Sequence, residues 1–286
     1  HEATYGRGDE GIDVTPRLQS LVQDGRLSFT VSSKLFGDPC PGKTKTLRFT
    51  YELPGDDDHH IHEADDGRIV IVPIAPSKNV GIFYTSQVID PKYFRRVLGQ
   101  LALPHPIDVI TCSWKPIADN PFPEVGFPYH VRIHLTLVLQ ILKLLHIARE
   151  LGPYEHVFFL EDDVLYPEGY FDIEPFAGDV LLNTNYMGLF ERGFQKAMPH
   201  RQQPLHQVAM KLPAAIDHFT IRLAQALTVG VVEVEPYERA WATRQSPQPA
   251  VHINHGRNFT SHFNIYSKEE VEPWHPYWGA AASWWE

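Results

Sequence analysis

Short apolar runs that alternate with helical segments constrain the fold of this chain more than any other feature. Residues 80–84 and 107–111 are apolar runs of the kind that form strands buried on both faces, and residues 91–101 between them have a helical pattern. A long helix is predicted for residues 130–151, and the apolar run 156–160 follows it directly. This alternation predicts an α/β fold, in which helices flank a sheet.

The first part of the chain has a different pattern. Residues 27–31 and 47–51 have the composition of β-strands, and Gly and Pro turn signals separate them. Residues 68–74 have the composition of a last strand before the pattern changes. Because 286 residues exceed one average domain, we predict two. The first is a small all-β domain at residues 1–75, and the second is an α/β domain at residues 76–286.

Composition argues against two kinds of partner. The chain has 25 Lys and Arg against 35 Asp and Glu, a formal charge of −10, whereas a protein that wraps phosphate backbones needs a clustered basic face. Nucleic acid is therefore not the expected partner. The most apolar stretch, residues 131–147, contains Arg132 and Lys143, which are costly in lipid, so we predict no transmembrane segment. We expect a cytoplasmic location, either free or at the periphery of a membrane.

Two groups of potential metal ligands are not predicted to form a metal site. Residues 56–66 form a dense run of Asp, Glu and His. Contiguous charged residues are usually solvated, and metal ligands usually come from separate elements, so we predict an exposed linker there. Cys40 and Cys112 are far apart in the sequence and show no metal-ligand spacing.

Three acids after the strand predicted for residues 156–160 are the main candidate for a functional site. Glu161, Asp162 and Asp163 follow that strand directly, and α/β sheets bind ligands at the carboxyl ends of their strands. Adjacent carboxylates raise one another's pKa, so a hard divalent cation such as Mn²⁺ or Mg²⁺ is the simplest partner. Such an ion bridges a diphosphate and stabilises a departing phosphate. The alternative is that the acids only cap the turn or helix that follows.

The order of these features resembles the glycosyltransferases of the GT-A type, and family 2 in particular. The shared order is a βαβ start, a long helix, an apolar strand, an acid cluster, a Tyr-Pro-Glu-Gly turn and the aromatic pair Tyr170 and Phe171. The resemblance implies a Rossmann-like mixed sheet flanked by helices. It also implies an acidic D-x-D signature at a strand end that holds a metal ion on the diphosphate of the donor.

Carried over by position, the resemblance assigns roles to five residues of this chain. Asp163 would ligate the metal ion. Glu161 departs from the first acid of the signature and would face the nucleotide ribose or a metal-bound water, and Asp162 belongs to the same donor site. Thr85 and Ser86 lie after the first strand of the α/β domain, where the base and ribose would bind.

Many metal-dependent members of the GT-A type also use a histidine ligand far downstream of the acids. His252 and His255 are suitably placed in this chain, and a neutral imidazole binds a cation without repelling it. Arg257 is next to them, and its planar guanidinium suits a phosphate. The alternative is a His- and Asn-rich turn that binds no metal.

The resemblance also suggests a general base. Inverting enzymes of this class often keep the base near the amino end of a helix, and Asp217 has that place in the helix predicted for residues 213–227. An acid there also compensates the helix dipole in any protein. Glu233, Glu235 and Glu238 are rivals for the role. If none of these carboxylates is the base, a retaining mechanism becomes more plausible.

The amino-terminal domain resembles the small β domain found at the carboxyl end of certain DnaJ-like proteins. That resemblance covers about fifty residues and implies an accessory module rather than a catalytic one. The motifs that carry it are Tyr5-Gly6, Asp13-Val14-Thr15, Asp24-Gly25-Arg26-Leu27, Phe36-Gly37-Asp38-Pro39 and Lys45-Thr46-Leu47.

The leading hypothesis is a metal-dependent glycosyltransferase that moves a sugar from a nucleoside-diphosphate sugar to a hydroxyl of a glycan or another acceptor, with inversion favoured. One alternative is a non-catalytic carbohydrate- or partner-binding protein with a degenerate GT-A site. Another is a hydrolase or nucleotidyltransferase that uses the same acids. The first hypothesis predicts nucleotide binding that needs metal, the second predicts none, and the third predicts turnover without a sugar acceptor.

Overall fold

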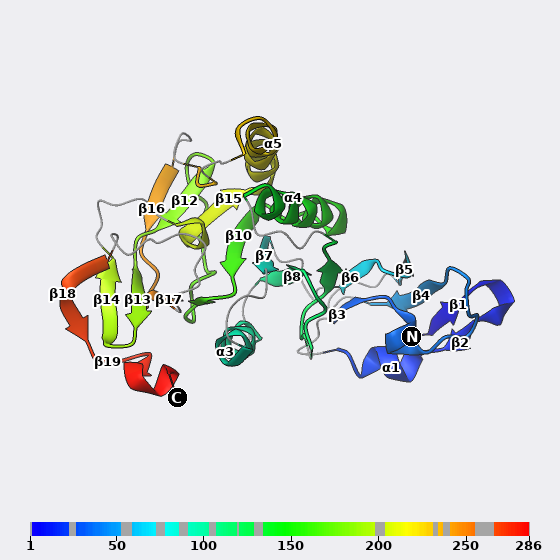
Figure 1. Cartoon of the computed structure of the whole chain (residues 1–286). Helices are drawn as coiled ribbons and strands as arrows, with labels where there is room; N and C mark the ends of the chain where they lie inside the picture. The colour runs from blue at the N-terminus through cyan, green and yellow to red at the C-terminus, as the bar shows by residue number, and fades with distance from the viewer. Residues whose placement is uncertain are drawn as a thin grey trace.

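The amino-terminal part of the chain folds as a small β unit (Figure 1). The computed structural model describes residues 2–22, 27–52, 59–72, 78–85, 91–102, 107–118, 120–128, 134–197, 204–230, 234–236, 241–254 and 266–285. In the β unit, antiparallel pairing gives a four-stranded sheet and a two-stranded sheet. The first sheet contains, in spatial order, β2 (Ile12–Asp13), β1 (Ala3–Gly6), β4 (Thr46–Tyr51) and β5 (His60–Asp65). The second sheet pairs β3 (Leu27–Thr30) with β6 (Ile69–Val72). Two short helices, α1 (Thr15–Gln19) and α2 (Ser33–Phe36), complete the unit.

Alternating apolar residues give the β unit its own core. Leu47 and Phe49 of β4 and Tyr5 of β1 are buried on one face of the sheet. Phe36, at the end of α2, packs on Tyr5 and Phe29 with ring centroids 5.2 and 5.6 Å apart. This cluster of aromatic and aliphatic side chains is separate from the two cores of the α/β part.

The exposed linker predicted for residues 56–66 is wrong for its second half. Residues His60–Asp65 form β5, which pairs with β4 along its whole length. The reason is that its imidazoles pack on the neighbouring strand, with the ring of His60 5.1 Å from that of Tyr51 and the ring of His62 5.3 Å from that of Phe49. Pairing and ring contacts therefore outweigh the polar composition of this run.

The α/β part is built on a seven-stranded mixed sheet, as expected. Every strand in it runs in one direction except β15, which is antiparallel to both of its neighbours. The order across the sheet is β16 (Trp241–Arg244), β12 (Val180–Asn183), β15 (Val208–Lys211), β10 (His156–Glu161), β7 (Asn79–Thr85), β8 (Asp108–Ser113) and β9 (Glu124–Gly126).

Helices cover both faces of this sheet (Figure 1). Helices α4 (His134–Leu151) and α5 (Leu212–Val229) pack on one face, and α3 (Pro91–Leu101) packs on the other. Because side chains alternate along a strand, Phe159 of β10 points to α4 and α5, whereas Phe158 points to α3. The strands are therefore apolar on both faces, which is why they appear as continuous apolar runs in the sequence.

A second sheet of five strands packs on the α3 side of the first, and the sequence did not predict it. Its first strand continues β10 after a turn at Asp162 and Asp163, so the chain passes from one sheet to the other at the acids. The order across this sheet is β11 (Val164–Leu165), β17 (Ala250–Ile253), β13 (Tyr186–Phe190), β14 (Gly193–Ala197) and β18 (Tyr266–Glu272). A separate pair of short strands, β19 (Trp274–His275) and β20 (Gly279–Ala280), follows in the sequence.

The structure confirms the predicted α/β class and most of its elements. The helix expected at residues 91–101 is α3, and the runs 80–84 and 156–160 lie within β7 and β10. The predicted domain boundary, between residues 75 and 76, lies outside the described residues and stays a prediction. In the part of the chain that the structure describes, no helix combines the length and the apolar character that a membrane crossing requires.

Gly81, in the central strand β7, provides a test of how tightly the sheet packs. A Cβ atom at this position would lie 2.6 Å from Leu160 Cδ1 and 3.0 Å from Ile107 Cδ1. Both neighbours are buried, so we expect Gly81→Ala to lower the free energy of unfolding by about 1–3 kcal/mol through overpacking. Urea denaturation measures this. Gly126→Ala in β9, where a Cβ would meet nothing within 4 Å, is the control, and equal effects at the two sites would contradict the prediction.

Candidate active site

The three acids lie at the point where the order of strands in the large sheet reverses. After β7 the chain places β8 and β9 on one side, and then returns to place β10 on the other side. Open α/β sheets bind ligands in the crevice outside the carboxyl ends of two such strands. Thr85 ends β7 and Glu161 ends β10, and the two strands are parallel neighbours. The register of the sheet thus brings Thr85 next to the acids, and its predicted role at the base and ribose of the donor stays a prediction.

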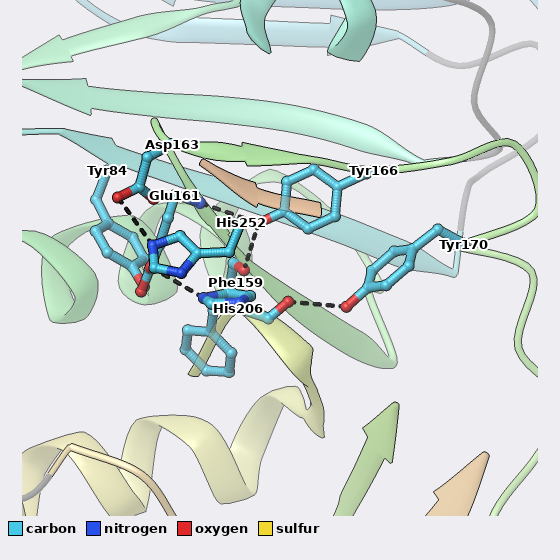
Figure 2. A network of polar contacts seen from close by, with 8 residues as sticks. All are labelled: Tyr84, Phe159, Glu161, Asp163, Tyr166, Tyr170, His206 and His252. Carbon is cyan, nitrogen blue, oxygen red and sulfur yellow. Dashed lines mark hydrogen bonds and ion pairs between the residues drawn. The ribbon is translucent and has the colours of Figure 1, made fainter. Parts of the chain in front are cut away.

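Glu161 is held by side chains from three directions (Figure 2). The hydroxyl of Tyr84 donates to its Oε1 at 2.9 Å, and Nδ1 of His206 lies 3.1 Å from its Oε2. Burial, and then the charge of Glu161, raise the pKa of Tyr84 well above its ordinary value, so this hydroxyl keeps its proton and remains a donor. The backbone amide of Glu161 also donates to the hydroxyl of Tyr166, at 3.1 Å. Each carboxylate oxygen thus has a protein partner that fixes its orientation.

Asp162 faces back to the end of β7. The hydroxyl of Thr85 donates a short hydrogen bond to its Oδ2. Burial raises the pKa of Asp162 to about 7, the charge of Asp163 adds to the rise, and the bond from Thr85 opposes it. Asp162 is therefore a carboxyl group with a pKa near neutral pH that is hydrogen-bonded to the last residue of β7.

Asp163 and His252 are brought together by pairing between the short strand β11 and β17. Val164 is the partner of His252 in this ladder, and the amide of Ile253 donates to the carbonyl of Asp163 at 2.7 Å. Nε2 of His252 lies 3.3 Å from Oδ2 of Asp163, and both residues are only 8% exposed. Burial lowers the pKa of His252, but the charge and hydrogen bond of Asp163 outweigh it, so the pKa is raised.

His206 lies between Glu161 and His252 and contacts both, as Figure 2 shows. It lies in the 3₁₀ turn η2 (Leu205–Gln207) and is 2% exposed. Its ring is 5.2 Å from the ring of His252, and its carbonyl accepts a 2.8 Å hydrogen bond from the hydroxyl of Tyr170. Among the described residues, its Nε2 has no hydrogen-bond partner. Glu161, Asp163 and the two histidines thus form one network, in which Asp163 and both histidines are buried.

The structure does not bring Asp217 to the acids. Lys211, just before α5, pairs with His156 at the amino end of β10, so α5 begins at the opposite edge of the sheet. Phe219 points inward and packs on Phe159, whereas Asp217 is exposed two residues earlier, on another face of the helix. Ser86, His255 and Arg257 lie outside the described residues, so their predicted roles remain predictions.

Of the three rivals for the role of base, Glu235 is the one that the structure describes. Its backbone carbonyl accepts a hydrogen bond from Arg222 of α5 at 3.4 Å, and its charge is the smallest of the causes that raise the pKa of the Tyr84 hydroxyl. The sequence could not distinguish Glu235 from Glu233 and Glu238, because all three lie in one short acidic stretch.

Sequence reasoning missed four residues of the network: Tyr84, Tyr166, Tyr170 and His206. Tyr84 had a signal, since it directly precedes Thr85, a predicted site residue. Tyr166 and Tyr170 follow the acids closely in the sequence, but nothing in the sequence predicts their hydrogen bonds to Glu161 and His206. His206 had no signal, because it is 45 residues from Glu161 in the sequence and only the sheet order joins them.

The residues present fit a divalent cation in part. Asp163 and His252 offer one oxygen and one nitrogen donor that face each other across 3.3 Å. Mn²⁺ accepts both kinds of donor, and Mg²⁺ in phosphate-binding sites is held by one or two carboxylates with the substrate and water. Within the described ranges, no group of three or more His, Cys, Asp or Glu side chains surrounds one point. The pair therefore fits a cation whose remaining ligands are phosphate and water.

Comparisons with known proteins give a likeness in fold and no match in sequence. No family model and no curated protein matches the chain. A structure from Desulfovibrio desulfuricans G20, described only provisionally as a nucleotide-diphospho-sugar transferase, has a TM-score of 0.36 and 13% identity over 59% of this chain and 80% of that one. TarS 1-349 of S. aureus, solved with UDP-GlcNAc, has a TM-score of 0.41 and 14% identity over 64% and 61% of the two chains.

A third structure is a glycosyltransferase involved in the glycosylation of the major capsid of PBCV-1. Its TM-score is 0.36, with 9% identity over 63% of this chain and 94% of that one. Likenesses this distant carry no argument for a function, so the functional conclusion rests on the geometry of this chain.

The raised pKa of Asp162 predicts how stability depends on pH in the absence of metal. An unfolded Asp ionises near pH 3.8, whereas folded Asp162 ionises near pH 7, so the stability of the wild type falls as pH rises from about 4 to 7. In Asp162→Asn this loss is absent, and Asn still offers Thr85 an acceptor. We expect the variant, measured by urea denaturation in EDTA, to gain about 2–4 kcal/mol on the wild type between pH 4 and pH 8.

Asp217→Asn, which changes an exposed Asp away from the acids, is the matched control and should show no such gain. Parallel curves of stability against pH for Asp162→Asn and the wild type would contradict the prediction.

Proposed function

We propose that this chain is a metal-dependent glycosyltransferase of the GT-A type, which moves a sugar from a nucleoside-diphosphate sugar to an acceptor hydroxyl. The observation that carries the proposal is the buried pair of Asp163 and His252 beside Asp162, at the carboxyl edge where strand order reverses. This is where an α/β sheet binds a nucleotide. The oxygen and nitrogen donors of the pair suit a cation that also binds phosphate.

The residues of the site would hold the metal ion and the sugar donor. Asp163 and His252 would hold Mn²⁺ or Mg²⁺, and the chemistry that the ion supplies when bound is neutralisation of the charge on the leaving diphosphate. Asp162 and Thr85, which are hydrogen-bonded to each other at the carboxyl ends of β10 and β7, would hold the ribose or base of the donor. Tyr84 and His206 hold Glu161, which keeps the end of β10 in place.

The first test is nucleotide binding by calorimetry with UDP, GDP, CDP and dTDP, each in Mn²⁺, in Mg²⁺ and in EDTA. We expect one nucleotide to bind only with metal. Asp163→Asn and His252→Ala remove the two protein ligands and should weaken this binding by about 100-fold or more, beyond the 10- to 100-fold typical of groups that only orient a ligand. Asp217→Asn should bind as the wild type does. A folded wild type that binds none of the four nucleotides would overturn the proposal.

For the general base, we propose Glu235 in place of Asp217. What supports it is that the charge of Glu235 contributes to the raised pKa of the Tyr84 hydroxyl, which donates to Glu161. Without an acceptor, a transferase of this kind can pass the sugar slowly to water, which releases the nucleoside diphosphate. We expect Glu235→Gln to slow this release by about 10²–10⁴-fold and to leave metal-dependent nucleotide binding unchanged. An unchanged rate of release would rule out Glu235 as the base.

One observation favours a second candidate, a binding protein with a degenerate site. The acids already have partners within the chain, since Tyr84 and His206 engage Glu161 and His252 engages Asp163. Such a network needs no cation to be stable. This candidate predicts that the folded chain binds no nucleotide with any metal, so the same calorimetry decides between the two.

A further inference from the structure

A cavity separate from the acids lies where the β unit meets the edge of the large sheet. Its volume is about 900 Å³, within the range of small-molecule sites. One wall is β3 with α1 and α2, and the other is formed by the end of α3, the start of β8 and the segment from Trp114 to Gly126. At its base the hydroxyl of Thr30 donates to the carbonyl of Glu124 and accepts from its amide. We name this cavity the β3–β9 groove.

Three cations and two carboxylates line the β3–β9 groove, so its charge is 3 − 2 = +1, whereas the chain as a whole carries −10. Arg17, Lys34 and Lys115 line it, and all three are exposed residues. Arg17 and Lys34 come from the β unit, and Lys115 comes from the opposite wall. Cations on both walls would bind a ligand whose negative charges are spread along its length.

The two carboxylates that line the groove are already engaged by the protein. Asp108 accepts a 3.0 Å hydrogen bond from the hydroxyl of Tyr154. Glu124 is enclosed by its own loop, with donors from a hydroxyl, a backbone amide and a side-chain amide, which belong to Ser113, Ile117 and Asn120. These neutral donors stabilise the two carboxylates in their charged form, so the exposed side chains of Arg17, Lys34 and Lys115 are the charged groups left to contact a ligand.

Aromatic side chains lie between the cations. Phe29 of β3, together with Trp114 and Phe122 of the opposite wall, lines the groove, and the last two are partly exposed. Ligand sites are lined mainly by apolar and aromatic side chains with a few polar or charged groups, and aromatic side chains offer large flat apolar faces to a ligand. A groove with aromatic side chains on its walls and cations around them fits a linear ligand in which non-aromatic rings carry acidic groups.

The β3–β9 groove also extends to the edge of the sheet that carries the acids. Trp114 directly follows Ser113, the last residue of β8, and Ser113 pairs with Thr85. Thr85 in turn donates to Asp162. Since β7 alone separates β8 from β10, the end of the groove lies about 10 Å from the acids, or two strand spacings.

From this arrangement we infer that the β3–β9 groove binds an anionic glycan, a chain of sugar rings that carry carboxylate groups. The role of that glycan as the acceptor rests on the proposed function, but its binding does not. The β unit then supplies half of the binding surface for the acceptor, through Arg17 and Lys34.

The inference is tested by calorimetry of the full chain with three soluble probes, without nucleotide or metal. The probes are a hexamer of galacturonic acid, a neutral hexamer of glucose and linear polyphosphate. We expect the acidic hexamer to bind at least about tenfold more tightly than either of the others, which corresponds to about 1.4 kcal/mol. The double variant Arg17→Ala/Lys34→Ala should weaken its binding about tenfold, and Arg17→Lys/Lys34→Arg should restore it.

Arg48→Ala is the matched control, because Arg48 is an exposed cation of the same β unit that pairs with Glu63 away from the groove. It should bind the acidic hexamer as the wild type does, and thermal unfolding checks that every variant is folded. Polyphosphate binding as tight as that of the acidic hexamer, equal binding of the neutral hexamer, or no effect of the double variant would each overturn the inference. Nucleotide binding measured on the same samples shows separately whether the proposed function holds.

Discussion

Three consecutive carboxylates at the end of a buried strand impose the constraint on which the site is built. Charges this close raise the free energy of the folded state unless each finds a donor or an opposite charge. The chain meets this with a different partner for each acid. Glu161 has Tyr84 and His206, Asp162 has Thr85, and Asp163 has His252. No partner is a neighbour in sequence, so the acids are stable only after both sheets have assembled.

This requirement also explains how the two sheets are joined. The chain leaves the large sheet at Glu161, turns through Asp162 and Asp163, and enters the small sheet at Val164. The acids therefore have partners in both sheets, with Thr85 in β7 and His252 in β17. The aromatic rings after the turn, Tyr166, Tyr170 and Phe171 among them, are fully or almost fully buried and pack between the sheets. Packing of these rings fixes the turn, and the turn fixes the acids.

The sequence predicted what depends on local pattern and missed what depends on the order of strands. Apolar runs and helical periodicity located β7, β10 and α3, and the position of Glu161 to Asp163 after a buried run located the site. Asp217 was predicted as the base from its place near the amino end of a helix, and that pattern does not say at which edge of the sheet the helix starts. Strand β15 is antiparallel, so α5 starts at the other edge. Nothing in residues 207–212 signals that direction.

His252 shows how much of the site depends on register. Strand β17 pairs with both β11 and β13, in which His252 is the partner of Val164 and of Gly188. A slip by one residue would turn His252 to the opposite face of the sheet and bring an apolar side chain, Val251 or Ile253, toward Asp163. The hydrogen bond from the amide of Ile253 to the carbonyl of Asp163 opposes that slip. The same backbone contact that aligns the sheets therefore keeps an imidazole, rather than an apolar side chain, against the buried acid.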